Sequence, residues 1–165
     1  MNITLIGMAG AGKTTVGKQL AKKLNMVFVD TDRLIEEEYG KKLNEIIIES
    51  GSEKFIEIEN KIISALEFEN TIIATGGSAV YGKDAMNHLK NISKIVYLDV
   101  PLWKIKLRIN NPDSRGIVSE KGRTIDEIFF ERLRYYKKYS HMSVKCKGKK
   151  LSQITAEIID SIGTI

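Results

Sequence analysis

The chain has 165 residues, enough for one compact domain with a full core and too few for two ordinary domains. Hydrophobic residues make up 42% and charged residues 28%, as in globular proteins, and no apolar run approaches the ~20 residues that cross a bilayer. The chain opens without a basic and apolar leader and contains one cysteine, Cys146, so we expect a cytoplasmic protein that is neither exported nor membrane-anchored.

The first predicted elements are a buried strand, a glycine-rich loop and a helix. Residues Ile3 to Ile6 form a short apolar run, and Gly7-Met8-Ala9-Gly10-Ala11-Gly12-Lys13-Thr14 matches every fixed position of G-x-x-x-x-G-K-[ST]. Behind it, Val16, Leu20 and Leu24 recur at helical spacing. Strand, glycine loop and helix in this order predict a loop that binds the phosphates of a nucleoside triphosphate. A plain glycine-rich turn would not require the whole motif.

The residue types of this loop suit phosphate chemistry. Glycines allow successive N–H groups to point into one concavity, and the new helix adds its own unpaired N–H groups and the positive end of its dipole. Lys13 is expected to reach the β- and γ-phosphates, and the Thr14 hydroxyl to bind Mg²⁺. The predicted nucleotide-binding residues here are Gly10, Ala11, Gly12, Lys13, Thr14 and Thr15.

Two aspartates follow the second predicted strand. Met26 to Val29 reads as a strand and Thr31 to Tyr39 as a helix, with Asp30 and Asp32 at their junction. A carboxylate there can hold Mg²⁺ through water or accept a proton from an attacking hydroxyl. The alternative is that Asp30 caps the helix while Asp32 favours its first turn, and capping is compatible with a functional role.

A glycine pair follows the third predicted strand. Residues 43–68 look helical with a bend near 50–52, and Thr71 to Ala74 is the strand that comes next. Gly76 and Gly77 then permit close approach of a substrate to backbone N–H groups. A simple strand-to-helix turn would also use glycine, so both interpretations stay open.

The remaining pattern alternates strands and helices. We predict a strand at Lys94 to Leu98, a short strand at Ser143 to Lys145, and helices at Lys83 to Leu89, Pro101 to Ile109, Ile125 to Tyr139 and Leu151 to Ile162. This alternation predicts an α/β fold with a parallel sheet covered by helices on both faces. Ligands of such sheets bind beyond the carboxyl ends of the strands, where the glycine loop, the aspartates and the glycine pair should converge.

Two polar segments invite functional interpretation. Residues 110–122 form a long, turn-rich connection, typical of a mobile lid, and Arg115 within it could neutralise charge on a transferring phosphoryl group. A solvated surface arginine is the alternative.

The net charge of +5 and the lysines between Lys145 and Lys150 could indicate a nucleic-acid site, but no aromatic residues are interleaved there. We read this cluster as a solvated loop and expect no nucleic-acid partner, and we read Cys146 as a bystander that nearby lysines could make more acidic.

Taken together, these motifs resemble the shikimate kinase family, within the nucleoside-monophosphate-kinase-like group of P-loop proteins. The resemblance rests on the phosphate loop Gly7 to Thr14, the pair Asp30 and Asp32, the pair Gly76-Gly77, Arg115 in the lid, and Arg132 with Tyr136 on a late helix. It covers nearly the whole chain. It implies a three-layer fold with a five-stranded parallel sheet, a helical substrate-binding region at about 31–60 and a lid at about 110–123.

The resemblance also implies roles and ligands. Lys13, Asp32 and Arg115 would be catalytic, with Asp32 binding and orienting the acceptor hydroxyl. Thr14 and Asp30 would organise Mg²⁺, and Arg108 would lie against the adenine. Gly76, Gly77 and Arg132 would bind the acceptor, and Arg132 would pair with the carboxylate group of the acceptor. The implied ligands are ATP, Mg²⁺ and shikimate, and we expect a monomer.

This chain departs from the family pattern on the acceptor side. The family usually carries F-R-x-x-E, but here Ile56 follows Phe55 and replaces the arginine, while Glu59 is kept. Ser78 replaces a usual third glycine, and the lid lacks the Pro-Leu that often follows its arginine. Two alternatives therefore stay open: a kinase for another small hydroxylated anionic metabolite, and a nucleotide-binding protein without catalysis.

Overall fold

A computed structural model describes residues 1–109 and 122–163. Its centre is a five-stranded sheet in the order β2-β3-β1-β4-β5, and every neighbouring pair is parallel. The strands are β1 (Asn2–Ile6), β2 (Val27–Asp30), β3 (Thr71–Ala74), β4 (Ser93–Asp99) and β5 (Met142–Lys145). The predicted parallel α/β architecture is confirmed.

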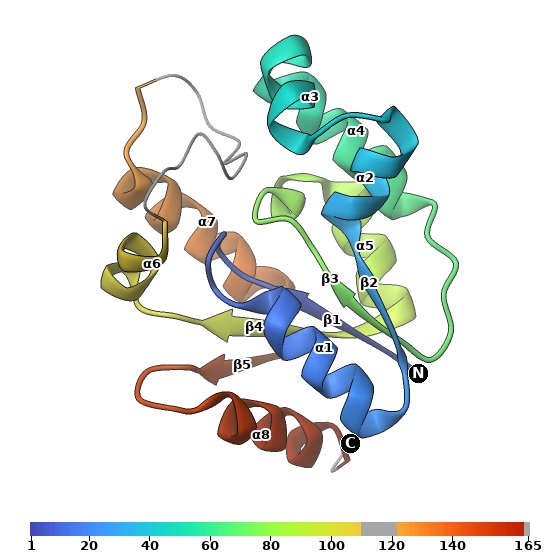
Figure 1. Cartoon of the computed structure of the whole chain (residues 1–165), viewed down its shortest axis with the longest axis vertical. Coiled ribbons are helices and arrows are strands. Elements are labelled where there is room, and N and C mark those ends of the chain that lie inside the picture. The colour runs from blue at the N-terminus through green and yellow to red at the C-terminus, as the bar shows by residue number, and fades with distance from the viewer. Residues whose placement is uncertain (110–121, 164–165) are drawn as a thin grey trace.

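Helices connect the strands and cover both faces of the sheet. They are α1 (Lys13–Leu24), α2 (Thr31–Tyr39), α3 (Leu43–Ser50), α4 (Ser52–Ser64), α5 (Lys83–Ile92), α6 (Leu102–Arg108), α7 (Ile125–Tyr139) and α8 (Leu151–Gly163), with a 3₁₀ turn η1 (Ala79–Tyr81). Helices α1 and α8 pack together on one face, and α5 and α7 contact β4 on the other (Figure 1). Every residue of β1 and residues Ile95 to Leu98 of β4 are buried as a consequence, since both faces of these strands are covered.

The register of the sheet brings the carboxyl ends of three strands together. Ala74 of β3 pairs with both Leu5 of β1 and Asp30 of β2. The segments that follow these three residues therefore leave the sheet at one edge, as the sequence predicted. They are the phosphate loop, the start of α2 and the glycine pair.

Helices α2, α3 and α4 form a small unit above this edge (Figure 1). The unit has its own hydrophobic cluster, separate from the main core, built from Ile35, Ile46, Phe55 and Ile58. Ile56 is partly buried and packs against this cluster. A separate core gives this region a physical basis as a subdomain, and residue 56 contributes to its packing.

Several boundaries differ from those predicted. The helical stretch predicted to reach residue 68 ends at Ser64, because backbone N–H groups of Ala65 and Leu66 bond to the carbonyls of Ile62 and Ile63 in a tightened last turn. Helix α5 continues to Ile92, and the turn η1 was not predicted. The bend near residue 51 is confirmed: Gly51 has a φ of 80° between α3 and α4.

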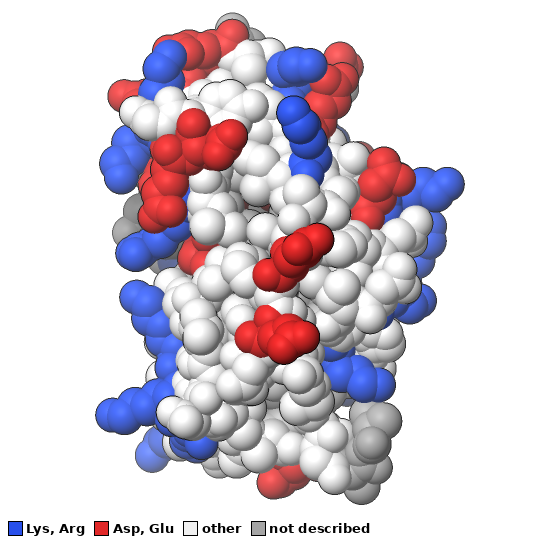
Figure 2. Space-filling model, turned by 90° about the vertical axis from the view of Figure 1, so that its right-hand side faces the viewer, with Lys and Arg blue, Asp and Glu red and all other residues white. Residues whose placement is uncertain are grey.

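The surface carries charge of both signs. On the face shown in Figure 2, acidic and basic side chains are interspersed over a largely uncharged background. Among the described residues, no helix has the length and apolar character needed to span a membrane. The concentration of buried charge described below therefore belongs to the cleft and contrasts with this face.

One buried side chain joins the amino ends of three segments. Asn2 is 4% exposed; its Nδ2 donates to the carbonyls of Phe68 (2.6 Å) and Ile92 (3.1 Å), and its Oδ1 accepts from the N–H of Thr71 at 3.0 Å.

We expect Asn2→Ala to lower the free energy of unfolding by roughly 2–4 kcal/mol, because it leaves buried backbone groups unpaired. Denaturant unfolding measures this. The control Asn87→Ala, on an exposed position of α5, should change stability by less than about 0.5 kcal/mol. Equal effects of the two variants would contradict the assigned role.

Candidate active site

A cleft of about 850 Å³ lies at the carboxyl edge of the sheet. Its walls come from the phosphate loop, the start of α2, the glycine pair, α6, α7 and the β5–α8 connection. Most sequence-predicted residues line it: Gly10, Ala11, Gly12, Lys13, Thr14, Thr15, Asp30, Asp32, Gly76, Gly77, Arg108 and Arg132. The spatial convergence that the sequence required is therefore present.

The phosphate loop holds Lys13 inside its own curve. Nζ of Lys13 donates to the carbonyls of Gly7 (2.6 Å) and Met8 (2.8 Å), and the residue is 8% exposed. Gly10 and Gly12 have φ values of 78° and 93°, which glycine adopts without steric cost. Burial lowers the pKa of Lys13 to about 8, although Asp32 and Asp30 oppose that shift. A bound polyphosphate would oppose it further, so the ammonium form suits a nucleotide-filled site.

Thr14 and Asp30 present a pair of oxygen ligands beside the loop. Oγ1 of Thr14 donates to Oδ2 of Asp30 at 2.9 Å, while Oδ1 of Asp30 accepts from the N–H of Asp32 at 3.1 Å. Asp30 thus caps α2 and also faces the phosphate loop, so the capping and functional interpretations hold together. Among the described residues, no three His, Cys, Asp or Glu side chains gather as a metal cluster. The oxygens of Thr14 and Asp30 are of the kind that Mg²⁺ binds when phosphates and water supply its other ligands.

Asp32 and Glu59 direct unpaired carboxylate oxygens toward the glycine pair. Oδ1 of Asp32 and Oε1 of Glu59 are buried without a hydrogen-bond partner among the residues that the structure describes, and each would lie 2.6 Å from a Cβ at Gly76. Burial, with a further contribution from Asp30, raises the pKa of Asp32 to about 6. Burial and the nearby charge of Asp32 raise the pKa of Glu59 to about 8. At neutral pH the site therefore holds one largely ionised and one largely protonated carboxyl group.

The glycine pair leaves room for these side chains. The N–H of Gly76 donates to Oγ1 of Thr31 at 3.3 Å, and Oγ of Ser78 donates to Oε2 of Glu59 at 2.7 Å. The Ser78 hydroxyl thus supplies a partner for Glu59 inside the buried wall. Sequence reasoning left the roles of Glu59 and Ser78 open, because only the fold brings α4 against the turn that follows β3.

Arg132 enters the cleft from α7. It is 1% exposed and lines the same cavity as Lys13 and Asp32. Its Nη1 would lie 2.9 Å from a Cβ at Gly77, and Tyr136, one turn along α7, donates from its hydroxyl to the Gly77 carbonyl at 2.8 Å. Helix α7 and the glycine pair are therefore fixed against each other, and a buried cation faces the phosphate loop across the cleft.

The outer part of the cleft forms a second wall. Nη1 of Arg108 donates to the carbonyl of Gly10 at 2.8 Å, which ties α6 to the phosphate loop. Cleft-lining residues that sequence reasoning did not assign to the site are Ala9, Val16, Leu43, Thr75, Lys104, Leu107, Cys146, Lys149, Leu151 and Ile154. Cys146 is 3% exposed, and its burial raises the pKa of its thiol to about 11, so burial outweighs the acidifying effect of the nearby lysines. Lys149, placed in a solvated loop by the sequence, pairs with Glu157 and borders the cleft.

The structure does not place the predicted lid arginine. Arg115 belongs to residues 110–121, which lie outside the described part of the chain. Its catalytic role remains a prediction from the sequence. The other two predicted catalytic residues, Lys13 and Asp32, share the cleft with the predicted metal, nucleotide and acceptor ligands.

The chain is similar to known proteins along its whole length. A family model described as "Shikimate kinase" matches residues 9–163. A shikimate kinase of Sulfurihydrogenibium sp. is 38% identical over 162 residues, which cover 98% of this chain and 97% of the relative. Among solved structures, shikimate kinase from Acinetobacter baumannii in complex with shikimate has a TM-score of 0.88 and 26% identity, covering 99% of this chain and 93% of the other. Shikimate kinase from Aquifex aeolicus has a TM-score of 0.84 and 31% identity, covering 99% and 96%.

The protonated state of Glu59 gives a prediction for stability. An unfolded glutamate binds its proton only below about pH 4.5, but in the folded protein Glu59 keeps it to about pH 8. The folded state therefore binds more protons between these values, and stability falls as the pH rises. Between pH 6 and 8 the difference between the wild-type protein and a Glu59 variant reports this group, because the other titrating groups, Asp32 and Lys13 among them, are present in both proteins.

We expect Glu59→Gln to remove a loss of roughly 2 kcal/mol between pH 6 and 8, since the amide keeps the shape but carries no titrating proton. Urea unfolding at several pH values measures the slope. The matched control is Glu57→Gln, on the same helix but exposed and paired with Lys54, which should keep the wild-type slope. A slope that persists in Glu59→Gln would contradict a buried neutral Glu59.

Proposed function

The chain belongs to the shikimate kinase family, and we propose from this that it transfers the terminal phosphoryl group of ATP to a hydroxyl group of shikimate. The observation that carries the proposal is the convergence of Lys13, Asp32 and Arg132 on one cleft. A phosphoryl donor, an alcohol and a carboxylate each find a group of suitable chemistry there. This convergence also argues against a nucleotide binder without catalysis, which would not need all three.

The donor side is built by the phosphate loop. We propose that the N–H groups of residues 10–15 and the positive end of α1 hold the phosphate oxygens, as the loop geometry favours. Lys13 would then exchange its carbonyl partners for phosphate oxygens and offset the charge that develops during transfer. Arg108, tied to the loop at Gly10, would lie beside the nucleotide base.

A divalent cation fits next to Thr14 and Asp30. We propose Mg²⁺ here, held by the threonine hydroxyl and by Asp30 directly or through water. When bound, it supplies charge neutralisation on the phosphate oxygens. The Thr14–Asp30 hydrogen bond already places both oxygens on the same side of the loop.

The acceptor side is built by Asp32, the glycine pair and Arg132. The unpaired Oδ1 of Asp32 is suited to accept a hydrogen bond from a substrate hydroxyl and then its proton as the new bond forms. A pKa of about 6 leaves Asp32 ionised at neutral pH, so it can act as the acceptor. Arg132 would pair with the substrate carboxylate through its planar fork. The buried walls around both groups exclude water and so limit wasteful hydrolysis of ATP.

Coupled measurement of ADP release tests the proposal directly. We expect shikimate at millimolar concentration to stimulate ADP release strongly over the rate without acceptor, and the product to be a phosphate monoester of shikimate. Lys13→Ala should abolish turnover with any acceptor, because it removes the cation from the phosphate loop. Release of ADP that does not respond to shikimate would contradict the proposal, and stimulation by other hydroxy acids alone would redirect it to a different acceptor.

Replacement of Arg132 should separate acceptor binding from nucleotide binding. We expect Arg132→Lys to raise the KM for shikimate roughly 10- to 100-fold, because a lysine keeps the charge but loses the bidentate fork, while the KM for ATP changes by less than about threefold. Steady-state kinetics with each substrate varied in turn measures both constants. The control Arg134→Lys changes the same helix at a residue stacked on Tyr135, outside the cleft lining. Parallel increases in both KM values would argue against an acceptor role for Arg132.

A further inference from the structure

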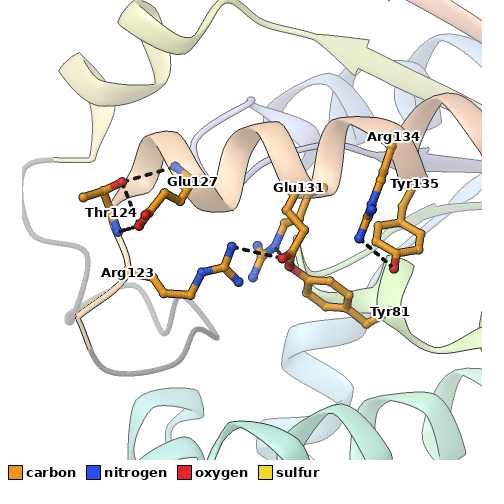
Figure 3. A network of polar contacts seen from close by, with 8 residues as sticks. Tyr81, Arg123, Thr124, Glu127, Glu131, Arg134 and Tyr135 are labelled. Atoms are coloured by element: carbon orange, nitrogen blue, oxygen red, sulfur yellow. Dashed lines mark hydrogen bonds and ion pairs between the residues drawn. The ribbon is translucent and has the colours of Figure 1, made fainter.

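The hydroxyl of Tyr81 lies between a buried cation and an acid from the same helix. It accepts a hydrogen bond from Nε of Arg132 at 3.3 Å and donates one to Oε1 of Glu131. The second oxygen of Glu131 is 3.0 Å from Nη2 of Arg123. Figure 3 shows Arg123, Glu131 and Tyr81 following one another beside α7. We call these four residues the Tyr81 network.

The ring of Tyr81 is held as firmly as its hydroxyl. Tyr81 ends the turn η1, only four residues after Gly77, and η1 packs against α7. The guanidinium carbon of Arg132 lies 5.3 Å from the centre of the Tyr81 ring, and Tyr135 meets that ring edge-on at 5.6 Å. Glu131 and Arg132 are adjacent on a helix and so project in directions about 100° apart, which lets Tyr81 contact both.

The network engages one end of the Arg132 guanidinium. An arginine has five N–H donors in a rigid plane, and here Nε is directed to Tyr81 while Nη1 lies at Gly77 on the cleft wall. We propose that Tyr81, held by Glu131, is a positioning residue that orients Arg132 toward the anionic group of the acceptor. This inference rests on the proposed function, in which Arg132 binds the acceptor carboxylate.

The charges around Tyr81 keep its hydroxyl protonated between Glu131 and Arg132. Glu131 is paired with Arg123, and hydrogen bonds from Arg123 and then Tyr81 lower the pKa of Glu131. Burial and the hydrogen bond to Glu131 raise the pKa of Tyr81, so its hydroxyl stays protonated at neutral pH. A neutral hydroxyl therefore stands between Glu131 and Arg132, and Glu131 acts on the arginine through this hydroxyl.

Orientation in advance of binding has a measurable benefit. A free arginine loses side-chain entropy when it docks on a carboxylate, whereas a guanidinium fixed through Nε and stacked on a ring has already lost much of it. A bidentate pair is also sensitive to the plane of the guanidinium. Loss of the Tyr81 hydroxyl should therefore weaken acceptor binding and leave nucleotide binding unchanged.

The test is the variant Tyr81→Phe, which removes the hydroxyl and keeps the ring. We expect the KM for shikimate to rise roughly tenfold, while kcat and the KM for ATP stay within about twofold. The control Tyr139→Phe changes a buried tyrosine of α7 that belongs to the hydrophobic core, and it should leave all three constants near their wild-type values. Thermal unfolding of both variants establishes that they are folded.

An uncharged acceptor distinguishes orientation of Arg132 from general damage to the site. The methyl ester of shikimate keeps the ring hydroxyls but lacks the anionic charge, and its KM, or its constant as a competitive inhibitor, can be measured with each enzyme. We expect the Tyr81→Phe effect to shrink to less than about twofold with the ester, because Arg132 then has no carboxylate to match. An equal effect on acid and ester would overturn the positioning role.

Variants of Glu131, a partly exposed residue, give an independent test. Glu131→Ala frees the Tyr81 hydroxyl and should raise the shikimate KM several-fold, whereas Glu131→Gln retains an oxygen that accepts from Tyr81 and should restore most of the wild-type value. A shikimate KM that is unchanged in both Tyr81→Phe and Glu131→Ala overturns the inference. If instead the wild-type protein does not phosphorylate shikimate at all, it is the proposed function that fails.

Discussion

The site depends on the burial of ionisable side chains, which are largely shielded from water. Lys13, Asp32, Glu59 and Arg132 surround one cleft, and burial is the largest influence on the pKa of each of the first three. Removing such groups from water costs free energy, and the protein groups present compensate for it only in part. The unpaired oxygens of Asp32 and Glu59 show where compensation is incomplete. The proposed acceptor, which carries hydroxyl groups, would offer hydrogen-bond partners to these oxygens.

The rest of the fold supports this arrangement. A fully covered parallel sheet supplies the hydrophobic burial that offsets the cost, and the shared register at Ala74 brings three loops to one edge. At the amino ends of the strands, by contrast, the buried side chain of Asn2 uses both its amide nitrogen and its oxygen in hydrogen bonds. Stability is thus concentrated at one end of the sheet and unsatisfied polarity at the other.

Local patterns explain why much of this could be predicted from the sequence. The phosphate loop is specified by consecutive residues, and strand–helix alternation fixes the edge at which Asp30, Asp32 and Gly77 meet. Arg132 was identified through a family resemblance, since nothing in its neighbours along the helix distinguishes it from a surface arginine. The Tyr81 network and the Ser78–Glu59 hydrogen bond escaped prediction because their partners lie 50, 51 and 19 residues apart. The burial of Cys146 could not be read from its neighbours along the chain, which are lysines, because it depends on packing beside β4, where its N–H donates to the Asp99 carbonyl.

The acceptor wall is where the chain differs from its family pattern, and the differences are mutually consistent. Ile56 packs into the core of the α2–α4 unit and brings no cation to the cleft, so Glu59 lies without an arginine at that position. The raised pKa keeps Glu59 neutral near pH 7, and Ser78 supplies a hydroxyl partner at 2.7 Å. A neutral acid with a hydroxyl partner does not need the missing charge. In the proposed function the binding of an anionic acceptor relies on Arg132, so the proposed orientation of this arginine by Tyr81 and Glu131 would matter more here than in a relative that carries a second arginine.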